Sequence, residues 1–500
     1  MLEFIKKSCE KFPERNSFYI NDQPFSYKTL SGKISAIRLS IEETDQSETN
    51  LVGVLLHDDI ETYAAVFGIL FAGKGFVPIN PEVPLDRNAS IIEQSEIQTI
   101  LASKMDAELK EYCISNNISV INSAELKETP INLELPNISD ESIAYLLFTS
   151  GSTGIPKGVP IRRKNLNAFI DAFFALGYQI DENDKFLQMF ELTFDLSIMS
   201  YMVPLCKGAC VYTVSPEQIK YMAIYSLLED HEITFALMVP SILSYLKPYF
   251  DDIRLEKLKY SLFCGEALYK DIAEDWKNCV PNALLQNVYG PTEATIFCLT
   301  YDINSSDSKE YNGILCIGKP MKNVEAIIVD ENLKSLSSTQ KGELCLYGSQ
   351  NTAGYWKNPE KNKEAFFTIT ENGLDKIYYK TGDLAYFDEN GEFLYAGRID
   401  NQVKIDGFRV ELSEIEHHAR EFTKKTNAVA IAFQNNIGNT QIVLCIEKFT
   451  EGEEELMTFL KTKLPVYMIP SNVQSLDVFP LNINGKIDRK AIKKQIESTL

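Results

Sequence analysis

A short loop between two apolar runs constrains this chain most. Residues 143–148, IAYLLF, predict a buried strand, and residues 157–163, KGVPIRR, predict a second one. The segment between them, TSGSTGIP (149–156), consists of glycines, hydroxyl residues, Ile and Pro. Small residues let main-chain N–H groups face an anion, the hydroxyls add donors, and Lys157 adds a positive charge. Taken alone, the segment fits either a polyphosphate site or a flexible surface hairpin.

The spacing around the lysine distinguishes this loop from a P-loop. Pro156 precedes Lys157 and Gly158 follows it, whereas the G-x-x-x-x-G-K-[ST] pattern requires a glycine before the lysine and a hydroxyl residue after it. The type of phosphate site therefore has to be read from the rest of the chain.

The pattern around the loop predicts an α/β fold. Strand-like runs alternate with helix-like runs over the first 300 residues, as in NLVGVLLHDD (50–59) followed by ETYAAVFGILFAG (61–73). After about residue 310 the chain reads as short strands and turns, and DENG (388–391) between two aromatic-rich runs predicts a hairpin. A chain of 500 residues is too long for one ordinary core, and a boundary is expected within GRIDNQVKIDG (397–407).

Composition excludes several classes of protein. The formal net charge is −21, which argues against nucleic acid as a partner. Gly, Lys and Pro interrupt the apolar runs, so we expect no transmembrane segment and no signal sequence. The ten cysteines form no Cys-x-x-Cys pair and only four histidines accompany them, which argues against a zinc site and a disulfide scaffold. We therefore expect buried free thiols and a cytoplasmic protein.

Further segments resemble the adenylate-forming superfamily, which includes acyl- and aryl-CoA synthetases, peptide-synthetase adenylation domains and luciferases. Besides the loop, the matching segments are FDLS (194–197), NVYGPTEATI (287–296), IGKP (317–320), GELCLYG (342–348), the run from Tyr379 to Glu416, and NGKIDR (484–489). They occur in the family's order. The resemblance implies a ligase that forms carbon–sulfur bonds: a carboxylate attacks the α-phosphate of ATP, pyrophosphate leaves, and a thiol captures the acyl-adenylate.

The resemblance also implies a domain organisation. The expected large N-terminal domain, residues 1–398, has two α/β subdomains and a β-rich part at about 310–398. A small, mobile α+β domain follows at 399–500 and swings about a hinge near Asp400. Gly407 would then leave room for a thin thiol-bearing arm. The alternative for Asp400 and Gly407 is a plain linker with an Asp-Gly turn.

The resemblance implies a nucleotide site with Mg²⁺. The residues expected around the β- and γ-phosphates are Thr149, Ser150, Gly151, Ser152, Thr153, Gly154 and Lys157. In the NVYGPTE segment, the residues expected around the adenine and the α-phosphate are Asn287, Tyr289, Gly290 and Thr292, and Glu293 is the expected Mg²⁺ carboxylate. The alternative for YGPTE is a turn that enters a helix capped by Thr292.

Three more residues complete the implied machinery. Asp383 would accept hydrogen bonds from the ribose hydroxyls, and Arg398 would be a second ribose or phosphate contact. Lys486, just after Asn-Gly, would bridge the carboxylate and the phosphate as the catalytic lysine. The alternatives are an ordinary ion pair for Asp383 and Arg398, and a solvated turn lysine for Lys486.

The substrate depends on Asp195, which in the amino-acid-activating branch binds the α-ammonium. Its alternative is the N-cap of the following helix. By resemblance, the pocket around it is apolar and leaves room for a small side chain; it consists of Leu196, Met199, Leu237, Leu262, Cys264, Val288, Ile296 and Phe297. The alternative for these residues is ordinary core. The segments FDLSIM, LFCGEAL and VYGPTEATI together resemble D-alanine–D-alanyl carrier protein ligases.

The expected thiol is the phosphopantetheine of a separate acyl carrier protein. Its candidate docking residues near the C-terminus are Lys486, Arg489, Lys490, Lys493 and Lys494, and the last three fit a solvated helix face equally well. A stand-alone adenylation domain for another amino acid, in a nonribosomal peptide or siderophore pathway, fits the sequence too. In an acyl- or aryl-CoA ligase Asp195 would be an unpaired buried charge. Lys157, Glu293, Asp383 and Lys486 are all present, which argues against a non-catalytic homologue.

Overall fold

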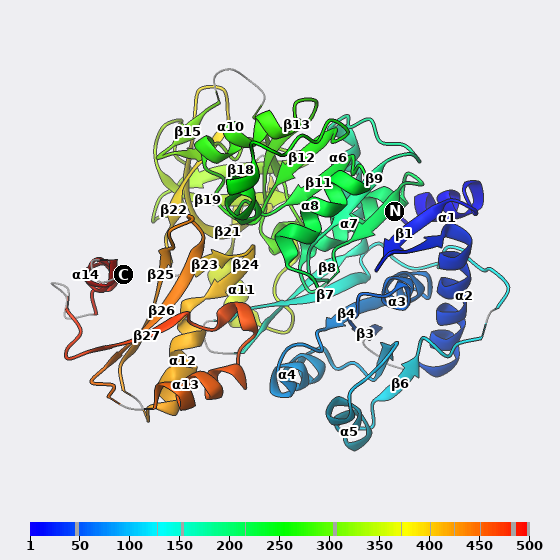
Figure 1. The fold of residues 1–500 in the computed structure, drawn as a ribbon, viewed down its shortest axis with the longest axis horizontal. Helices are drawn as coiled ribbons and strands as arrows, with labels where there is room; N and C mark the ends of the chain where they lie inside the picture. The colour runs from blue at the N-terminus through cyan, green and yellow to red at the C-terminus, as the bar shows by residue number, and fades with distance from the viewer. Residues whose placement is uncertain are drawn as a thin grey trace. The chain divides into compact units, whose positions relative to one another are not determined.

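The described chain forms two compact units. The computed structural model describes residues 1–45, 50–127, 129–151, 155–215, 217–303, 308–371, 373–400, 402–424, 426–450, 452–481 and 487–497. The first unit comprises Met1–Pro81, Ile92–Leu147 and Gly158–Ile399. The second unit comprises Glu82–Ile91, Phe148–Lys157 and Asp400–Leu500. Figure 1 traces the elements of both units in chain order.

A sheet of six described strands begins the first unit, and the phosphate-loop segment leaves from it. Its order is β6 (Ser119–Asn122), β5 (Thr99–Ala102), β3 (Leu51–Leu55), β4 (Gly75–Ile79), β7 (Ile143–Thr149) and β8 (Lys157–Arg162). β3 and β4 are parallel and are joined by α3 (Ile60–Phe71), as the alternating pattern predicted. Asp59 starts α3 because its carboxylate accepts a hydrogen bond from Thr62 N at 2.8 Å.

A second sheet, of nine described strands, carries the NVYGPTE segment. Its order is β17 (Lys319–Pro320), β14 (Leu299–Asp302), β13 (Leu284–Tyr289), β12 (Tyr260–Phe263), β11 (Phe235–Met238), β9 (Lys185–Gln188), β10 (Cys210–Thr213), β1 (Asn16–Ile20) and β2 (Gln23–Ser26). The strands from β10 to β13 run parallel, so their carboxyl ends meet at one edge.

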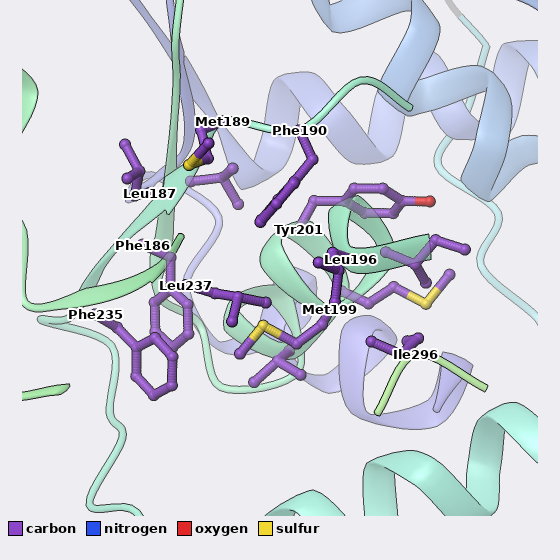
Figure 2. Packing of buried hydrophobic residues seen from close by; sticks show 14 of the residues in the cluster. Phe186, Leu187, Met189, Phe190, Leu196, Met199, Tyr201, Phe235, Leu237 and Ile296 are labelled. Carbon is purple, nitrogen blue, oxygen red and sulfur yellow. The ribbon is translucent and has the colours of Figure 1, made fainter. Parts of the chain in front are cut away.

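Helices cover these two sheets. They are α1 (Leu2–Lys11), α2 (Tyr27–Thr44), α5 (Ala107–Ser115), α6 (Arg163–Ala175), α7 (Asp195–Leu205), α8 (Lys220–Asp230), α9 (Ser241–Leu246) and α10 (Lys270–Cys279), with the 3-10 turns η1 (Lys247–Tyr249) and η2 (Thr292–Ala294). The first part of α4 (Leu85–Ser95) belongs to the second unit. α2 and α3 pack side by side, as Figure 1 shows. One large cluster of buried apolar residues joins helices and strands, and Figure 2 shows part of it around α7.

The β-rich part of the first unit is a sheet in the order β18 (Val324–Val329), β19 (Gly342–Gly348), β21 (Leu374–Phe387) and β20 (Phe366–Glu371), with β22 (Phe393–Arg398) also pairing with β21. α11 (Pro359–Ala365) precedes β20, and β15 (Glu310–Tyr311) pairs with β16 (Ile314–Leu315). β21 and β22 are the two sides of the hairpin that DENG predicted. The mixed α/β fold class is therefore confirmed.

The second unit has its own sheets and core. β25 (Ala428–Gln434), β26 (Thr440–Glu447) and β27 (Asn472–Leu476) form one sheet, and β23 (Gln402–Ile405) pairs with β24 (Phe408–Glu411). Its other elements are α12 (Leu412–Phe422), α13 (Glu453–Lys461), η3 (Val466–Met468) and α14 (Arg489–Glu497). Apolar side chains of α12, α13 and the sheet form a separate core. The unit begins at Asp400 along the C-terminal part of the chain.

No helix among the described residues combines the length and the apolar character that crossing a bilayer requires. All ten cysteines are buried as thiols, as expected from their spacing.

Candidate active site

A buried hydrogen-bond network joins Tyr289, Asp383 and Arg398. The antiparallel register of β21 and β22 places Asp383 directly opposite Arg398, and Arg398 Nη1 donates to Asp383 Oδ1 at 2.9 Å. The hydroxyl of Tyr289, at the end of β13, donates to the other carboxylate oxygen. Burial and the Asp383 charge raise the pKa of Tyr289 well above its ordinary value of 10, so the hydroxyl keeps the proton that it donates. The structure thus brings three of the predicted nucleotide residues together.

The ion pair between Asp383 and Arg398 was the alternative interpretation of these two residues, and the structure contains it. Arg398 Nη1 also donates to the carbonyl oxygen of Thr381 at 3.0 Å, and Asp383 N donates to Thr381 Oγ1 at 3.0 Å. These contacts fix the carboxylate on the inner strand β21, and its oxygens can accept hydrogen bonds from a diol.

Asn287 and Gly290 shape the backbone on either side of Tyr289. The amide nitrogen of Asn287 donates to Cys316 O at 2.9 Å, so this side chain is held by the main chain. A Cβ added at Gly290 would lie 2.3 Å from Phe297 Cα, which means that only glycine allows the chain to fold back here. No local sequence signal indicated this close approach.

Thr292 and Glu293 lie in η2, which begins two residues after that glycine. Pro291 occupies the N-cap position of this three-residue turn, so the alternative in which Thr292 caps a helix is wrong. Glu293 is fully buried, and its Oε1 accepts a hydrogen bond from the Tyr355 hydroxyl at 2.7 Å. A buried oxygen donor of this kind fits Mg²⁺, which prefers carboxylate and phosphate oxygens.

Tyr355 was not predicted as a site residue. It belongs to the segment GSQNTAGYW (348–356), which follows β19 and carries no recognisable catalytic pattern. In the same segment, Thr352 N donates to Glu293 O at 2.8 Å. The segment therefore supports Glu293 through both its side chain and its main chain.

Asp195 is the first residue of α7 and is buried, with 4% of its surface exposed. Phe194 is the N-cap and no side chain caps the helix, so the alternative in which Asp195 is the N-cap is wrong. Tyr145, on β7, lies close enough that its pKa is raised well above 10 by burial and by the Asp195 charge. Like Tyr355, Tyr145 was not predicted from the sequence as a neighbour of a site residue.

The predicted pocket residues all belong to one buried apolar cluster; they are Leu196, Met199, Leu237, Leu262, Cys264, Val288, Ile296 and Phe297. Figure 2 shows Leu196, Met199, Leu237 and Ile296 within it. Leu237 and Leu262 are direct partners in the pairing of β11 with β12. Their membership of one core cluster is what the alternative interpretation, ordinary core, predicts, and Leu196 and Met199 also follow Asp195 on α7.

The phosphate-loop residues are described within the second unit. Ser150 Oγ donates to Arg409 O at 2.8 Å, and Lys157 Nζ lies 3.5 Å from Glu411 Oε1. A Cβ added at Gly151 would lie 1.9 Å from Ile155 O, so this turn requires glycine. Thr149 ends β7, while Ser152, Thr153 and Gly154 lie outside the described residues.

Asp400, the hinge candidate, precedes the β23–β24 hairpin, and Gly407, the candidate for the thiol tunnel, lies in its turn. Asp400 Oδ1 accepts from Gln402 N at 3.1 Å. Asp406 and Gly407 form the two-residue turn with φ of 48° and 88°, the left-handed pair that an Asp-Gly hairpin favours. Lys486 lies outside the described residues, between Leu481 and Ile487, which form an antiparallel bridge.

Comparison with known proteins gives the family. The model of the AMP-binding enzyme family matches residues 5–356. This chain therefore belongs to the AMP-binding enzyme family, as the segments along the sequence predicted.

Three curated relatives illustrate the family. The chain is 32% identical to zwittermicin A synthase ZmaJ of Bacillus cereus over 98% of this chain and 94% of the relative. It is 31% identical to tyrocidine synthase 1 of Brevibacillus parabrevis, over 98% of this chain and 44% of the relative, so it spans less than half the length of that protein. It is 28% identical to the D-alanine–D-alanyl carrier protein ligase of Bacillus licheniformis, over 99% of both.

Solved structures share the fold. The adenylation domain AlmE of Vibrio cholerae, in complex with glycyl-adenosine-5'-phosphate, aligns with a TM-score of 0.87 at 23% identity, over 99% of this chain and 97% of that one. NpsA-ThdA of Klebsiella oxytoca, an artificially fused adenylation–PCP di-domain, aligns with a TM-score of 0.82 at 21% identity, over 95% of this chain and 93% of that one.

Proposed function

We propose that this protein is an AMP-forming acid–thiol ligase that activates a small amino acid with ATP and transfers it to the phosphopantetheine thiol of a separate carrier protein. The observation that carries the proposal is the buried carboxylate of Asp195 beside an apolar cluster, in a chain of the AMP-binding family. A buried carboxylate suits the α-ammonium of an amino acid, because a buried charge requires an opposite one. Fatty and aryl acids without an amine offer no such partner.

The proposed reaction has two steps. An oxygen of the amino acid carboxylate attacks the α-phosphorus of ATP, the bond from that phosphorus to the bridging oxygen breaks, and pyrophosphate leaves. The carrier thiolate then attacks the carbonyl carbon of the aminoacyl-adenylate, and AMP leaves with the electron pair. Both steps need the reacting groups held in place while charge moves between oxygens.

The site residues divide this work. Asp195 would hold the ammonium, and the network of Tyr289, Asp383 and Arg398 would orient the nucleoside through its ribose hydroxyls. The loop from Thr149 to Lys157 would bind the β- and γ-phosphates through main-chain N–H groups, hydroxyls and the lysine charge. Lys486 would steady the carboxylate and the α-phosphate as they approach.

Glu293 would hold the Mg²⁺ that accompanies ATP. Its carboxylate is buried and oriented by the Tyr355 hydroxyl, which suits an oxygen-seeking cation. When bound, the cation neutralises charge on the phosphate oxygens. Tyr355 keeps one carboxylate oxygen oriented.

Two small-amino-acid pathways are candidates. The resemblance to D-alanine–D-alanyl carrier protein ligase covers 99% of both chains and supports D-alanine. The identities of 32% to ZmaJ and 31% to tyrocidine synthase 1 favour an adenylation domain for another amino acid in a peptide assembly line. AlmE, which shares the fold, was crystallised with a glycyl-adenylate, and this supports a small side chain in either case.

Pyrophosphate release tests the proposal. The protein is incubated with ATP, Mg²⁺ and single D- or L-amino acids, glycine, and a few fatty and aryl acids. We expect release with one or a few small amino acids. A preference for D-alanine supports the carrier-ligase candidate, and a preference for another small amino acid supports the assembly line. Release only with acids that lack an amine would overturn the proposal.

A further inference from the structure

The segment after η2 has an unusual backbone. Thr295 and Ile296 have positive φ angles of 56° and 74°, although both are β-branched and both are buried. The left-handed region is a genuine outlier for β-branched residues, because Cβ crowds the neighbouring carbonyl. Such a conformation persists only where the surrounding structure holds it.

Gln350 holds this segment. Its side-chain nitrogen lies 3.0 Å from Phe297 O, 3.3 Å from Ala294 O and 3.5 Å from Thr295 O. Its own main-chain oxygen accepts a hydrogen bond from Thr295 Oγ1. Carbonyl oxygens only accept, so the amide nitrogen must face them. Gln350 therefore binds one carbonyl of the left-handed pair Thr295–Ile296 and the carbonyls directly before and after the pair.

Gln350 is itself fixed from the other side. Asn165, on α6, donates its amide nitrogen to Ser349 O and to Asn351 O, both at 2.8 Å. Asn351 in turn donates to Leu346 O, on β19, at 2.7 Å. The two carbonyls that flank Gln350 are thus held by a helix on one side.

An ordinary packing role does not explain a glutamine here. Gln350 is fully buried, and its Oε1 has no hydrogen-bond partner in the described part of the chain. An unsatisfied buried amide oxygen is unfavourable, so an apolar side chain would fill the same space at lower cost. What the glutamine adds is a donor for the three carbonyls.

The position of Ile296 depends on this backbone. Its side chain, 1% exposed, lies in the apolar cluster with Leu196 and Met199, which follow Asp195 on α7 (Figure 2). If Thr295 and Ile296 returned to an ordinary φ, the Ile296 side chain would point elsewhere. The apolar cluster at Leu196 and Met199, the residues that follow Asp195, would then lose one side chain.

We propose that Gln350 is a positioning residue that holds Ile296 in the apolar cluster beside Asp195 and thereby limits the substrate to amino acids with small side chains. The selectivity part rests on the proposed function, whereas the placement of Ile296 does not.

The test uses Gln350→Met, which keeps the volume and removes the donor. In protein labelled at isoleucine δ1 methyl groups, the Ile296 resonance is assigned with Ile296→Val. We expect Gln350→Met to shift this resonance. We also expect the kcat/KM of a larger amino acid, relative to the best small one, to rise about tenfold, the scale of one lost apolar contact. The KM for ATP should stay within about twofold of the wild type.

Gln286→Met is the matched control. Gln286 is also a buried glutamine, on β13, and its amide nitrogen donates to Asp302 Oδ1 at 2.5 Å. We expect this variant to lower the melting temperature but to leave the Ile296 resonance and the amino-acid selectivity unchanged. Thr295→Gly, added to Gln350→Met, should restore selectivity, because glycine adopts a positive φ without help.

Three results separate the possibilities. The proposal is overturned if Gln350→Met changes neither the Ile296 resonance nor selectivity, or if Gln286→Met changes both in the same way. If the wild type activates no amino acid, the proposed function fails, and the Ile296 resonance still tests the role of Gln350. If Gln350→Met does not fold, Gln350→Leu, which also lacks the donor and adds no charge, takes its place.

Discussion

Asp195 is the residue on which the substrate class depends. We expect Asp195→Ala to lower the kcat/KM for the amino acid about a thousandfold, since removing one partner of a buried ion pair costs roughly 4 kcal/mol. The KM for ATP should change little. Pyrophosphate release at varied amino acid and ATP concentrations measures both.

Asp184→Ala is the control for this variant. Asp184 is also buried in the first unit, and its carboxylate pairs with Lys259 Nζ at 2.7 Å. Its loss should destabilise the protein without selective loss of amino acid binding. If Asp184→Ala and Asp195→Ala lowered the kcat/KM for the amino acid equally, the proposed role of Asp195 would be contradicted.

Asp58 gives a prediction on pH. Burial raises its pKa from an ordinary 3.8 to about 6. Because the folded state binds the proton more tightly, the free energy of unfolding falls as pH rises from about 4 to about 6, and the loss is complete above that range. Asp58→Asn should therefore raise the free energy of unfolding at pH 7.5 by up to about 3 kcal/mol, which is seen as a higher melting temperature. At pH 4 the substitution should have little effect.

The neighbouring Asp59 is the control in the same thermal denaturation series. It caps α3, so Asp59→Asn keeps an acceptor, and Asp59→Ala should lower stability by about 1 kcal/mol at both pH values. A stabilisation by Asp58→Asn that did not depend on pH would be inconsistent with titration of the carboxyl group.

At the scale of elements, the turn between β13 and β14 depends on Gly290. A Cβ there would overlap Phe297 Cα, so Gly290→Ala should displace Tyr289 and Thr292 and raise the KM for ATP at least tenfold. Gly32→Ala is the matched control, because an added Cβ in α2 meets nothing within 4 Å and alanine favours the helix. Normal ATP binding by Gly290→Ala would show that the turn tolerates a shift.

The elements also show how far sequence reasoning reached. The alternation of strand-like and helix-like runs predicted β3 and α3, because that signal lies within neighbouring residues of the chain. The pairing of Asp383 with Arg398 lies beyond the register shift between Leu384 and Ala385, so the DENG turn alone does not determine it. Tyr355 and Gln350 contact residues 62 and 55 positions away, and only tertiary packing brings them there. The resemblance gave the proposed catalytic set, whereas the residues that contact it required the structure.

At the scale of the whole molecule, exposed positive charges on α14 are candidates for docking the proposed carrier protein. Lys490, Lys493 and Lys494 are exposed on α14, while Arg489 is paired with Glu416 at 2.6 Å. Because carrier proteins are typically acidic, Lys490→Glu combined with Lys494→Glu should lower kcat/KM for carrier aminoacylation about tenfold at low salt. Pyrophosphate release without carrier should not change. An unchanged transfer rate would locate docking elsewhere.

The two units give the last prediction. If the proposed hinge at Asp400 lets one unit present different residues in the two steps, a residue of the second unit can serve one step alone. Lys486→Ala should lower adenylate formation at least a hundredfold, because the lysine steadies charge only while the phosphate reacts. Transfer from a preformed aminoacyl-adenylate to the carrier should stay within about threefold. Lys448→Ala, an exposed lysine of the same unit, should affect neither step. Equal loss of both steps in Lys486→Ala would mean that one arrangement of the site serves the whole reaction.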